Sequence, residues 1–133
     1  MRPPLALALA LALTLAALGC GTPPEENACA GIVDVPLDQG RRGPNGEWIV
    51  GDWTSPRLHW GAFTTYRIHH GLGRPVTSPE CWASFTSNGA FAKQIGSACL
   101  VIPACGTEQG VTDTTVLMRN SGAQDFWGRI VLR

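Results

Sequence analysis

Short runs of β-branched and aromatic residues recur after residue 20, and turn-forming residues separate them. Apolar and polar positions alternate within these runs, as in half-buried strands, and no stretch keeps the 3.6-residue apolar period of a helix. The runs that we predict as strands are residues 47–53, 62–70, 81–87, 98–104, 114–119 and 125–133. Six or seven short strands at this spacing predict an all-β fold, an antiparallel β-sandwich or a small barrel. The length of the chain predicts one domain over residues 32–133.

The alternation also assigns side chains to faces, because neighbours on a strand point in opposite directions. Residues expected to point into the core are Phe126, Gly128, Ile130 and Leu132 of the last run, Cys81, Ala83 and Phe85 of residues 81–87, and Val116 and Met118 of residues 114–119. Trp82, Trp127, Leu117, Arg119 and Arg129 fall on the opposite, solvent side. Exposed tryptophan beside arginine is typical of recognition surfaces, so Trp82, Trp127, Arg119 and Arg129 form a candidate binding face. The alternative is that a loop covers these rings, or that the faces are reversed.

The first 19 residues have the organisation of an export signal. Arg2 follows the amino terminus, an apolar stretch runs from Leu5 to Leu18, and a small residue precedes Cys20. The apolar stretch is shorter than the roughly 20 residues that a membrane-spanning helix needs. The sequence therefore predicts a cleaved leader rather than a membrane span.

The end of this leader, LAALGC, resembles the lipobox of bacterial lipoproteins. The resemblance implies a signal peptide over residues 1–19, cleavage before Cys20, lipid on Cys20 and a lipidated polar tether over residues 20–31. The mature protein is then held on the membrane by its lipid. Gly21 stands where an aspartate would signal inner-membrane retention, so we expect the outer membrane. The alternative is a plain signal peptide, with Cys20 left in the leader or in a disulfide.

Five cysteines are an odd number for an exported chain. Lipid on Cys20 leaves four, which an oxidising compartment favours as two disulfides. Three pairings are possible. We expect Cys99 with Cys105, which closes a short loop, and Cys29 with Cys81, which attaches the tether to the domain. A zinc site is the weaker alternative, because no two cysteines have the C-x2-C spacing.

Two of the three histidines, His69 and His70, are adjacent and directly precede the turn GLG. On a strand they point to opposite faces, so they are not expected to hold one metal ion. A metal site would need a third ligand, such as His59, Asp52 or a reduced cysteine. We expect His70 to pack beside Tyr66 and to hydrogen-bond the turn backbone, which its glycines allow to reach positive φ.

Residues 66–75, YRIHHGLGRP, resemble the strand, histidine, Gly/Asn-Leu-Gly and proline pattern of β-rich modules in phage tail fibres and related surface proteins. The resemblance implies that His70, Leu72 and Gly73 form a structural turn and that the next strand begins after the proline. It also implies that residues 116–120 and 125–132 form a closing hairpin. It indicates a fold class and no particular activity.

Charge and motifs narrow the functional classes. Ten basic and ten acidic residues give a formal charge of zero, so the chain lacks the basic excess of nucleic-acid-binding proteins. The chain has no G-x-S-x-G, H-E-x-x-H or phosphate-loop motif, and we expect no cofactor and no metal. We predict a non-enzymatic envelope or surface module, binding or structural, with an envelope protein or a glycan as partner. The alternative is a small envelope hydrolase or metal-dependent enzyme that uses His69 or His70.

Overall fold

The computed structural model describes residues 27–96 and 98–133, which form twelve short strands and one 3-10 turn, η2 (Leu37–Gln39). The strands are β1 (Val33–Val35), β2 (Gly40–Arg42), β3 (Trp48–Val50), β4 (Leu58–Trp60), β5 (Thr65–His69), β6 (Glu80–Ser84), β7 (Lys93–Ile95), β8 (Leu100–Val101), β9 (Ala104–Cys105), β10 (Glu108–Gln109), β11 (Thr115–Arg119) and β12 (Phe126–Leu132). The leader and Cys20 lie outside the described residues. Within them, none of the helical structure is long and apolar enough to span a membrane.

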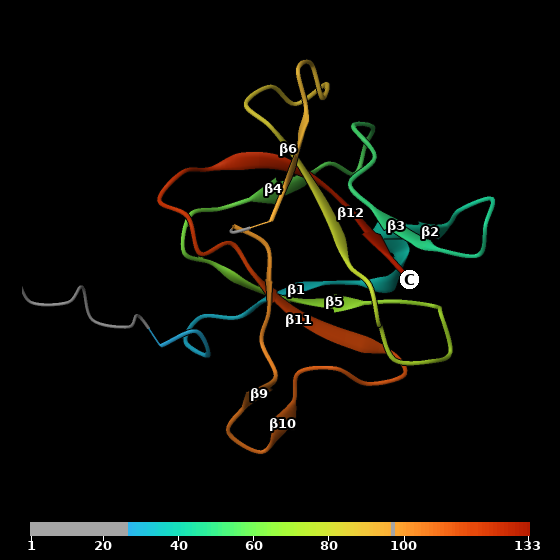
Figure 1. Cartoon of the computed structure of the whole chain (residues 1–133), viewed down its shortest axis with the longest axis vertical. Coiled ribbons are helices and arrows are strands. Elements are labelled where there is room, and N and C mark those ends of the chain that lie inside the picture. The colour runs from blue at the N-terminus through green and yellow to red at the C-terminus, as the bar shows by residue number, and fades with distance from the viewer. Residues whose placement is uncertain (1–26, 97) are drawn as a thin grey trace, which may run out of the picture.

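The strands form two main sheets, which confirms the predicted all-β sandwich (Figure 1). The smaller sheet has the order β1-β5-β11-β8, and the larger has the order β2-β3-β12-β6-β7, with β4 also paired to β12. Paired strands are antiparallel except β1 and β5, which run parallel. The hairpin of β9 and β10 is separate from both sheets and lies at the bottom of Figure 1, whereas the β6–β7 loop lies at the top.

The core lies between the two sheets and follows from the alternation in the strands. Tyr66, Ile68, Val116 and Met118 come from the smaller sheet and Val35 from its edge strand. The larger sheet contributes Trp48, Val50, Leu58, Trp60, Cys81, Ile130 and Leu132. Most of these side chains are almost fully buried, as the alternation predicted for the last run. Burial of one large apolar side chain stabilises the fold by about 1.5–3 kcal/mol, so this layer accounts for the pairing of the sheets.

The long strand β12 organises the larger sheet. It pairs with β6 along one edge, and with β4 and then β3 along the other. Gly51 follows β3 with φ +71°, and a Cβ atom there would lie 2.3 Å from the carbonyl oxygen of Gly128. Glycine is therefore required at residue 51, where the chain leaves β3 and passes close to the backbone of β12.

The two C-terminal strands do not form the closing hairpin that the tail-fibre resemblance implied. Strand β11 belongs to the smaller sheet and β12 to the larger, so their connection crosses the sandwich. Asn120 fixes this crossing. Its buried side-chain amide donates to the carbonyl oxygens of Trp60, at 3.1 Å, and Gln124, at 2.9 Å. The length of the loop is compatible both with a hairpin and with a crossing between the sheets. The hydrogen bonds of Asn120 are tertiary contacts, which loop length does not reveal.

Burial differs from the expected faces at Phe85 and Leu117, and also at Arg119, which is buried. Phe85 was expected in the core but is 73 % exposed, because β6 ends at Ser84, whose hydroxyl donates to the carbonyl oxygen of Ala90 at 2.7 Å. Leu117 was expected in solvent but is 1 % exposed. The β9–β10 hairpin lies over its face of the smaller sheet, since Glu108 of that hairpin binds Arg67, the residue opposite Leu117.

The four cysteines form two disulfides, as predicted, but the expected pairing was wrong. Cys29 bonds to Cys105 and Cys81 bonds to Cys99. Residues 99 and 105 were expected to close a short loop. Instead, β8 joins the smaller sheet and β9 leaves it for the separate hairpin, so Cys105 is carried towards the N-terminal segment. Cys81 is buried in the core, and Cys99 packs against the same core.

Candidate functional site

The outer face of the larger sheet brings together three of the four residues proposed for binding. Trp127 and Arg129 lie two residues apart on β12, and Trp82 of β6 is directly opposite Arg129. Both tryptophans are partly buried and partly open to solvent. We call Trp82, Trp127 and Arg129 the Trp–Arg face. Alternation predicted that all three side chains point away from the core, and the pairing of β12 with β6 brings them onto one face.

Trp82 is held by a carboxylate on its own strand. Its indole nitrogen donates a hydrogen bond to Glu80 Oε1 at 2.6 Å, and Arg133 donates to Glu80 Oε2 at 2.8 Å. These two donors, Arg133 first, hold the pKa of the Glu80 carboxyl below its ordinary value. Glu80 is two residues before Trp82 on one face, so the sequence carried a signal for this contact that we did not use.

Arg129 and Trp127 are positioned by residues from outside β12. Arg129 Nε forms an ion pair with Asp52 Oδ1 at 2.8 Å, and Arg41 of β2 binds the other oxygen of the same carboxylate. The His59 ring meets Trp127 edge to face, with centroids 5.6 Å apart. Asp52 falls within residues 47–53, which we predicted as one strand, but β3 ends at Val50, so alternation does not give the direction of this side chain.

Arg119 does not belong to this face. It lies on β11 of the smaller sheet, is 8 % exposed, and donates a hydrogen bond to Thr65 Oγ1 at 3.2 Å. Alternation gave its direction relative to its own strand. It could not show that β11 and β12 belong to different sheets, so the prediction joined Arg119 to a face on the other side of the sandwich.

The two histidines point to opposite faces, as alternation predicted. His70 is 2 % exposed, whereas the His69 side chain is 40 % exposed and its Nε2 lies 3.3 Å from Asp34 Oδ1. His70 Nδ1 accepts a hydrogen bond from the Leu72 amide at 3.4 Å, and Gly73 has φ +70°, so the predicted turn is present. The strand after the turn begins only at Glu80, later than the tail-fibre pattern implied.

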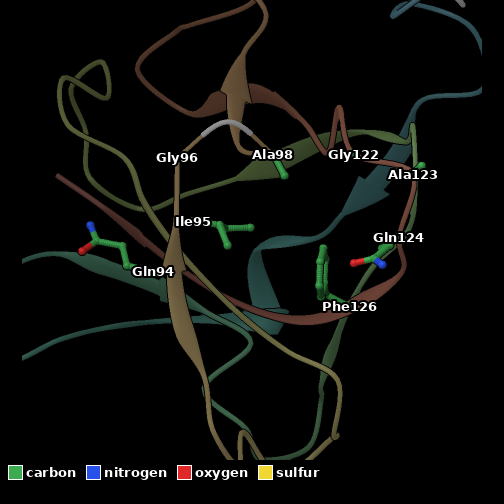
Figure 2. Close-up of a pocket in the computed structure, with 8 residues that line it drawn as sticks. All are labelled: Gln94, Ile95, Gly96, Ala98, Gly122, Ala123, Gln124 and Phe126. Carbon is green, nitrogen blue, oxygen red and sulfur yellow. The ribbon is translucent and has the colours of Figure 1, made fainter.

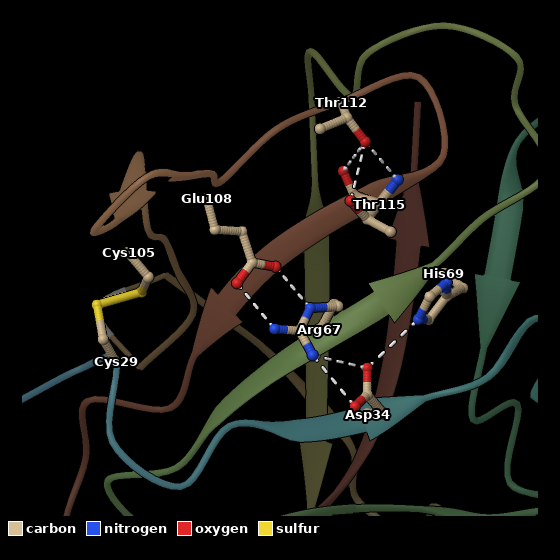
Figure 3. Close-up of polar contacts among 8 residues, drawn as sticks. All are labelled: Cys29, Asp34, Arg67, His69, Cys105, Glu108, Thr112 and Thr115. Carbon is tan, nitrogen blue, oxygen red and sulfur yellow. Dashed lines mark hydrogen bonds and ion pairs between the residues drawn. A yellow bond between two sulfur atoms is a disulfide. The ribbon is translucent and has the colours of Figure 1, made fainter.

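A charged cluster lies on the outer face of the smaller sheet (Figure 3). Arg67 donates to both oxygens of Glu108, at 2.6 and 2.8 Å, and to both oxygens of Asp34, at 3.0 and 3.1 Å. These hydrogen bonds lower the pKa of both carboxyls and raise that of Arg67. The ion pair of Arg67 with Glu108 and the Cys29–Cys105 disulfide both hold the β9–β10 hairpin in place, so we assign the cluster a structural role. We missed it because Glu108 reaches Arg67 from a distant hairpin.

The geometry for a metal ion is absent from the part of the chain that the structure describes. No group of three or more histidine, cysteine, aspartate or glutamate side chains converges there. All four described cysteines are in disulfides, which removes thiolate ligands. His69 has one carboxylate neighbour, Asp34, and that carboxylate is shared with Arg67.

A recessed site lies away from these charges, between β7 and the segment before β12 (Figure 2). Its volume is about 590 Å³. The residues that line it are Gln94, Ile95, Gly96, Ala98, Gly122, Ala123, Gln124 and Phe126. Ile95, Ala98 and Phe126 surround the space in Figure 2, whereas the Gln94 side chain points away from it. This cavity has no signal in the sequence pattern, because loops that alternation does not describe form most of its wall.

Comparisons with known proteins do not assign this chain to a family. The chain matches no protein-family model, no curated protein and no solved structure. Functional conclusions therefore depend on the residues themselves.

The burial of His70 predicts a pH-dependent stability. Desolvation lowers the pKa of His70, so below pH 6.5 the unfolded chain takes up a proton that the folded chain resists. We expect the free energy of unfolding to be constant above about pH 7.5 and to fall between pH 6.5 and 5, by at most about 1.4 kcal/mol per pH unit for one group. His70→Gln is expected to remove this slope, measured by urea denaturation at several pH values.

A matched variant separates this effect from general acid sensitivity. His59 is exposed, so His59→Gln should keep the wild-type slope. The Asp34, Glu80 and Glu108 carboxyls have lowered pKa values, and their contribution to stability is lost only as the pH falls below about 4.5. A slope between pH 6.5 and 5 that survives in His70→Gln contradicts the assignment.

Proposed function

We propose that this protein is a lipid-anchored envelope module that binds another envelope protein through the Trp–Arg face and catalyses no reaction. The observation that carries the proposal is the arrangement of Trp82 and Trp127 around Arg129 on one open sheet face. Tryptophan and arginine are the side chains that contribute most often to the energetic centres of protein interfaces.

The chemistry of this face favours a protein over a glycan. Charged residues of both signs surround the rings, with Arg129, Arg41 and Asp52 on one side and Glu80 with Arg133 on the other. Their ion pairs and the Trp82–Glu80 hydrogen bond fix the side chains before binding, which lowers the entropy lost when a partner docks. A surface of mixed charge around fixed aromatic anchors suits a partner with complementary charge.

The proposed anchor rests on the resemblance of LAALGC to a lipobox, and the Cys29–Cys105 disulfide limits the length of the tether. Residues 21–29 separate the predicted lipid on Cys20 from the disulfide to Cys105. A chain of this length spans at most about 30 Å. A tether of this length would keep the domain close to the membrane. The larger sheet would then be exposed to partners in the same compartment.

The double variant Trp82→Ala with Trp127→Ala tests the proposal. We expect loss of the partner signal with a change in unfolding free energy below about 1.5 kcal/mol, because neither ring belongs to the core cluster. The measurement is crosslinking in cells from a photoreactive phenylalanine at His59, which contacts Trp127. A discrete adduct with one envelope protein should form and should disappear in the double variant.

The same probe at Leu100 is the matched control, because this exposed residue lies on the smaller sheet. It should give no such adduct. Equal adducts from both positions, or an adduct that persists without the two tryptophans, would remove the Trp–Arg face from the proposal. A large loss of stability in the double variant would instead place the rings in a structural role.

A further inference from the structure

We propose that the cavity beside β7 is a second binding site, for an uncharged saccharide, separate from the Trp–Arg face. Its volume of about 590 Å³ falls within the range of small-molecule sites, roughly 300–1,000 Å³. It is open on one side, so it suits an exposed sugar unit of a longer chain.

One wall of the cavity is an aromatic surface that the fold leaves partly open. The Phe126 ring stands between Ile95 and Gln124 in Figure 2. The Phe85 ring supports it, with centroids 5.1 Å apart, and Phe85 is itself 73 % exposed. Phe126 gives the cavity wall an apolar surface on which the CH face of a sugar ring packs, and Phe85 contacts that ring without lining the cavity itself.

The polar group of the site is the Gln124 side chain. Its amide lies beside the Phe126 ring in Figure 2 and makes no hydrogen bond with any residue that the structure describes. An amide offers two donors and an acceptor, which matches hydroxyl or acetamido groups that both donate and accept. The amide is thus available to a ligand at the aromatic wall.

Small residues keep the space open. Ala98, Gly122 and Ala123 line it. A Cβ atom at Gly122 would lie 3.2 Å from Asn120 Oδ1 and 3.4 Å from the Cβ of Ala98. Asn120 is fully buried and bound to Trp60, so this wall cannot easily move to admit a larger residue.

The charge of the site selects the ligand class. None of the described residues that line the cavity is ionisable, in contrast to the Trp–Arg face with its arginines and carboxylates. A charged ligand would lose hydration there without gaining a counter-charge. A neutral saccharide carries the apolar faces and the hydroxyl groups that this wall and this amide can meet.

The test is an NMR titration of the isotope-labelled mature protein, lipid included, in detergent micelles. The probes are chitotriose and maltotriose. We expect at least one of them to give saturable shifts of the Gln124 side-chain amide and the Phe126 and Ala98 signals, with a dissociation constant of roughly 1 mM. Ala123→Trp, at an exposed residue of the cavity wall, should abolish the shifts, and Trp82→Ala should leave them unchanged.

Three outcomes overturn the saccharide site. The first is the absence of saturable shifts with both probes, and the second is a response confined to Trp82 and Trp127. The third is tighter binding of the uncharged peptide N-acetyl-Ala-Val-Ala-amide along β7, which would make the cavity a peptide site. The crosslinking from His59 is independent of all three, so each proposal can fail without the other.

Discussion

Replacement of Trp60 by alanine is expected to lower the free energy of unfolding by about 3–5 kcal/mol. Trp60 is 1 % exposed and stacks on Tyr66 of the opposite sheet, with ring centroids 4.6 Å apart and an interplanar angle of 17°. Its indole nitrogen also donates to the Ala98 carbonyl oxygen at 3.1 Å. The variant loses contact between the sheets and leaves a cavity that the surrounding strands cannot fill.

This loss is a large share of the total stability of a single domain, about 5–15 kcal/mol. Urea denaturation followed by circular dichroism measures it. Trp127→Ala is the matched control, because it removes the same side chain from the outer face and is expected to cost less than about 1.5 kcal/mol. Equal losses for Trp60 and Trp127 would contradict the assignment of core and surface.

Removal of the Cys29–Cys105 disulfide is expected to have the second large effect. The variant Cys29→Ser with Cys105→Ser should lose about 2–5 kcal/mol, because the bond closes a loop of 76 residues in the unfolded chain. It also loosens the β9–β10 hairpin, which is then held by Arg67 with Glu108 and by the backbone hydrogen bonds of Ile102 and Gly110 with Leu117. Thermal unfolding should therefore shift to a lower temperature, and proteolysis should cut the hairpin first.

The single variants show whether the pairing is correct. Cys29→Ser alone should leave one free thiol on Cys105 and the same loss of stability as the double variant. A free thiol on Cys81 in that variant would instead support the Cys29–Cys81 disulfide that we expected from the sequence. Peptide mapping of the two single variants distinguishes these outcomes.

Strands and faces were predictable where the chain keeps a regular alternation. Residues 125–133 contain β12, and Ile130 and Leu132 are buried as the pattern required. The outward direction of Trp82 and of Arg129 followed from the same rule, although their pairing did not. The period of two is a local property of the backbone, so it can be read without knowing which strands are neighbours.

Neighbour relations were not predictable, because they depend on tertiary contacts. The separation of β11 from β12 depends on hydrogen bonds from Asn120, and the disulfide pairing depends on the path of β9 away from β8. Strands β1, β2, β4 and β7 are only three residues long, too short to carry a recognisable alternation. Arg119 was misplaced for the same reason, since its own direction was correct and its sheet was not.

The candidate binding surfaces were also predictable only where regular strands form them. The Trp–Arg face was predictable from two strands, whereas Asp52, which fixes Arg129, comes from an irregular segment. The cavity beside β7 depends on Phe85 leaving the core after Ser84 and on a loop before β12. Loop geometry is set by side-chain hydrogen bonds such as that from Ser84 to Ala90, and these have no periodic signature.

The central proposal is that a modified sulfur at residue 20 holds a disulfide-stabilised sandwich on the membrane. Mass spectrometry of the protein extracted from membranes, digested without reduction, tests it most directly. We expect an N-terminal peptide that begins at Cys20 and carries the mass of acyl chains, together with peptides that join Cys29 to Cys105 and Cys81 to Cys99. An intact leader with free thiols, or an unmodified Cys20, would contradict the proposal.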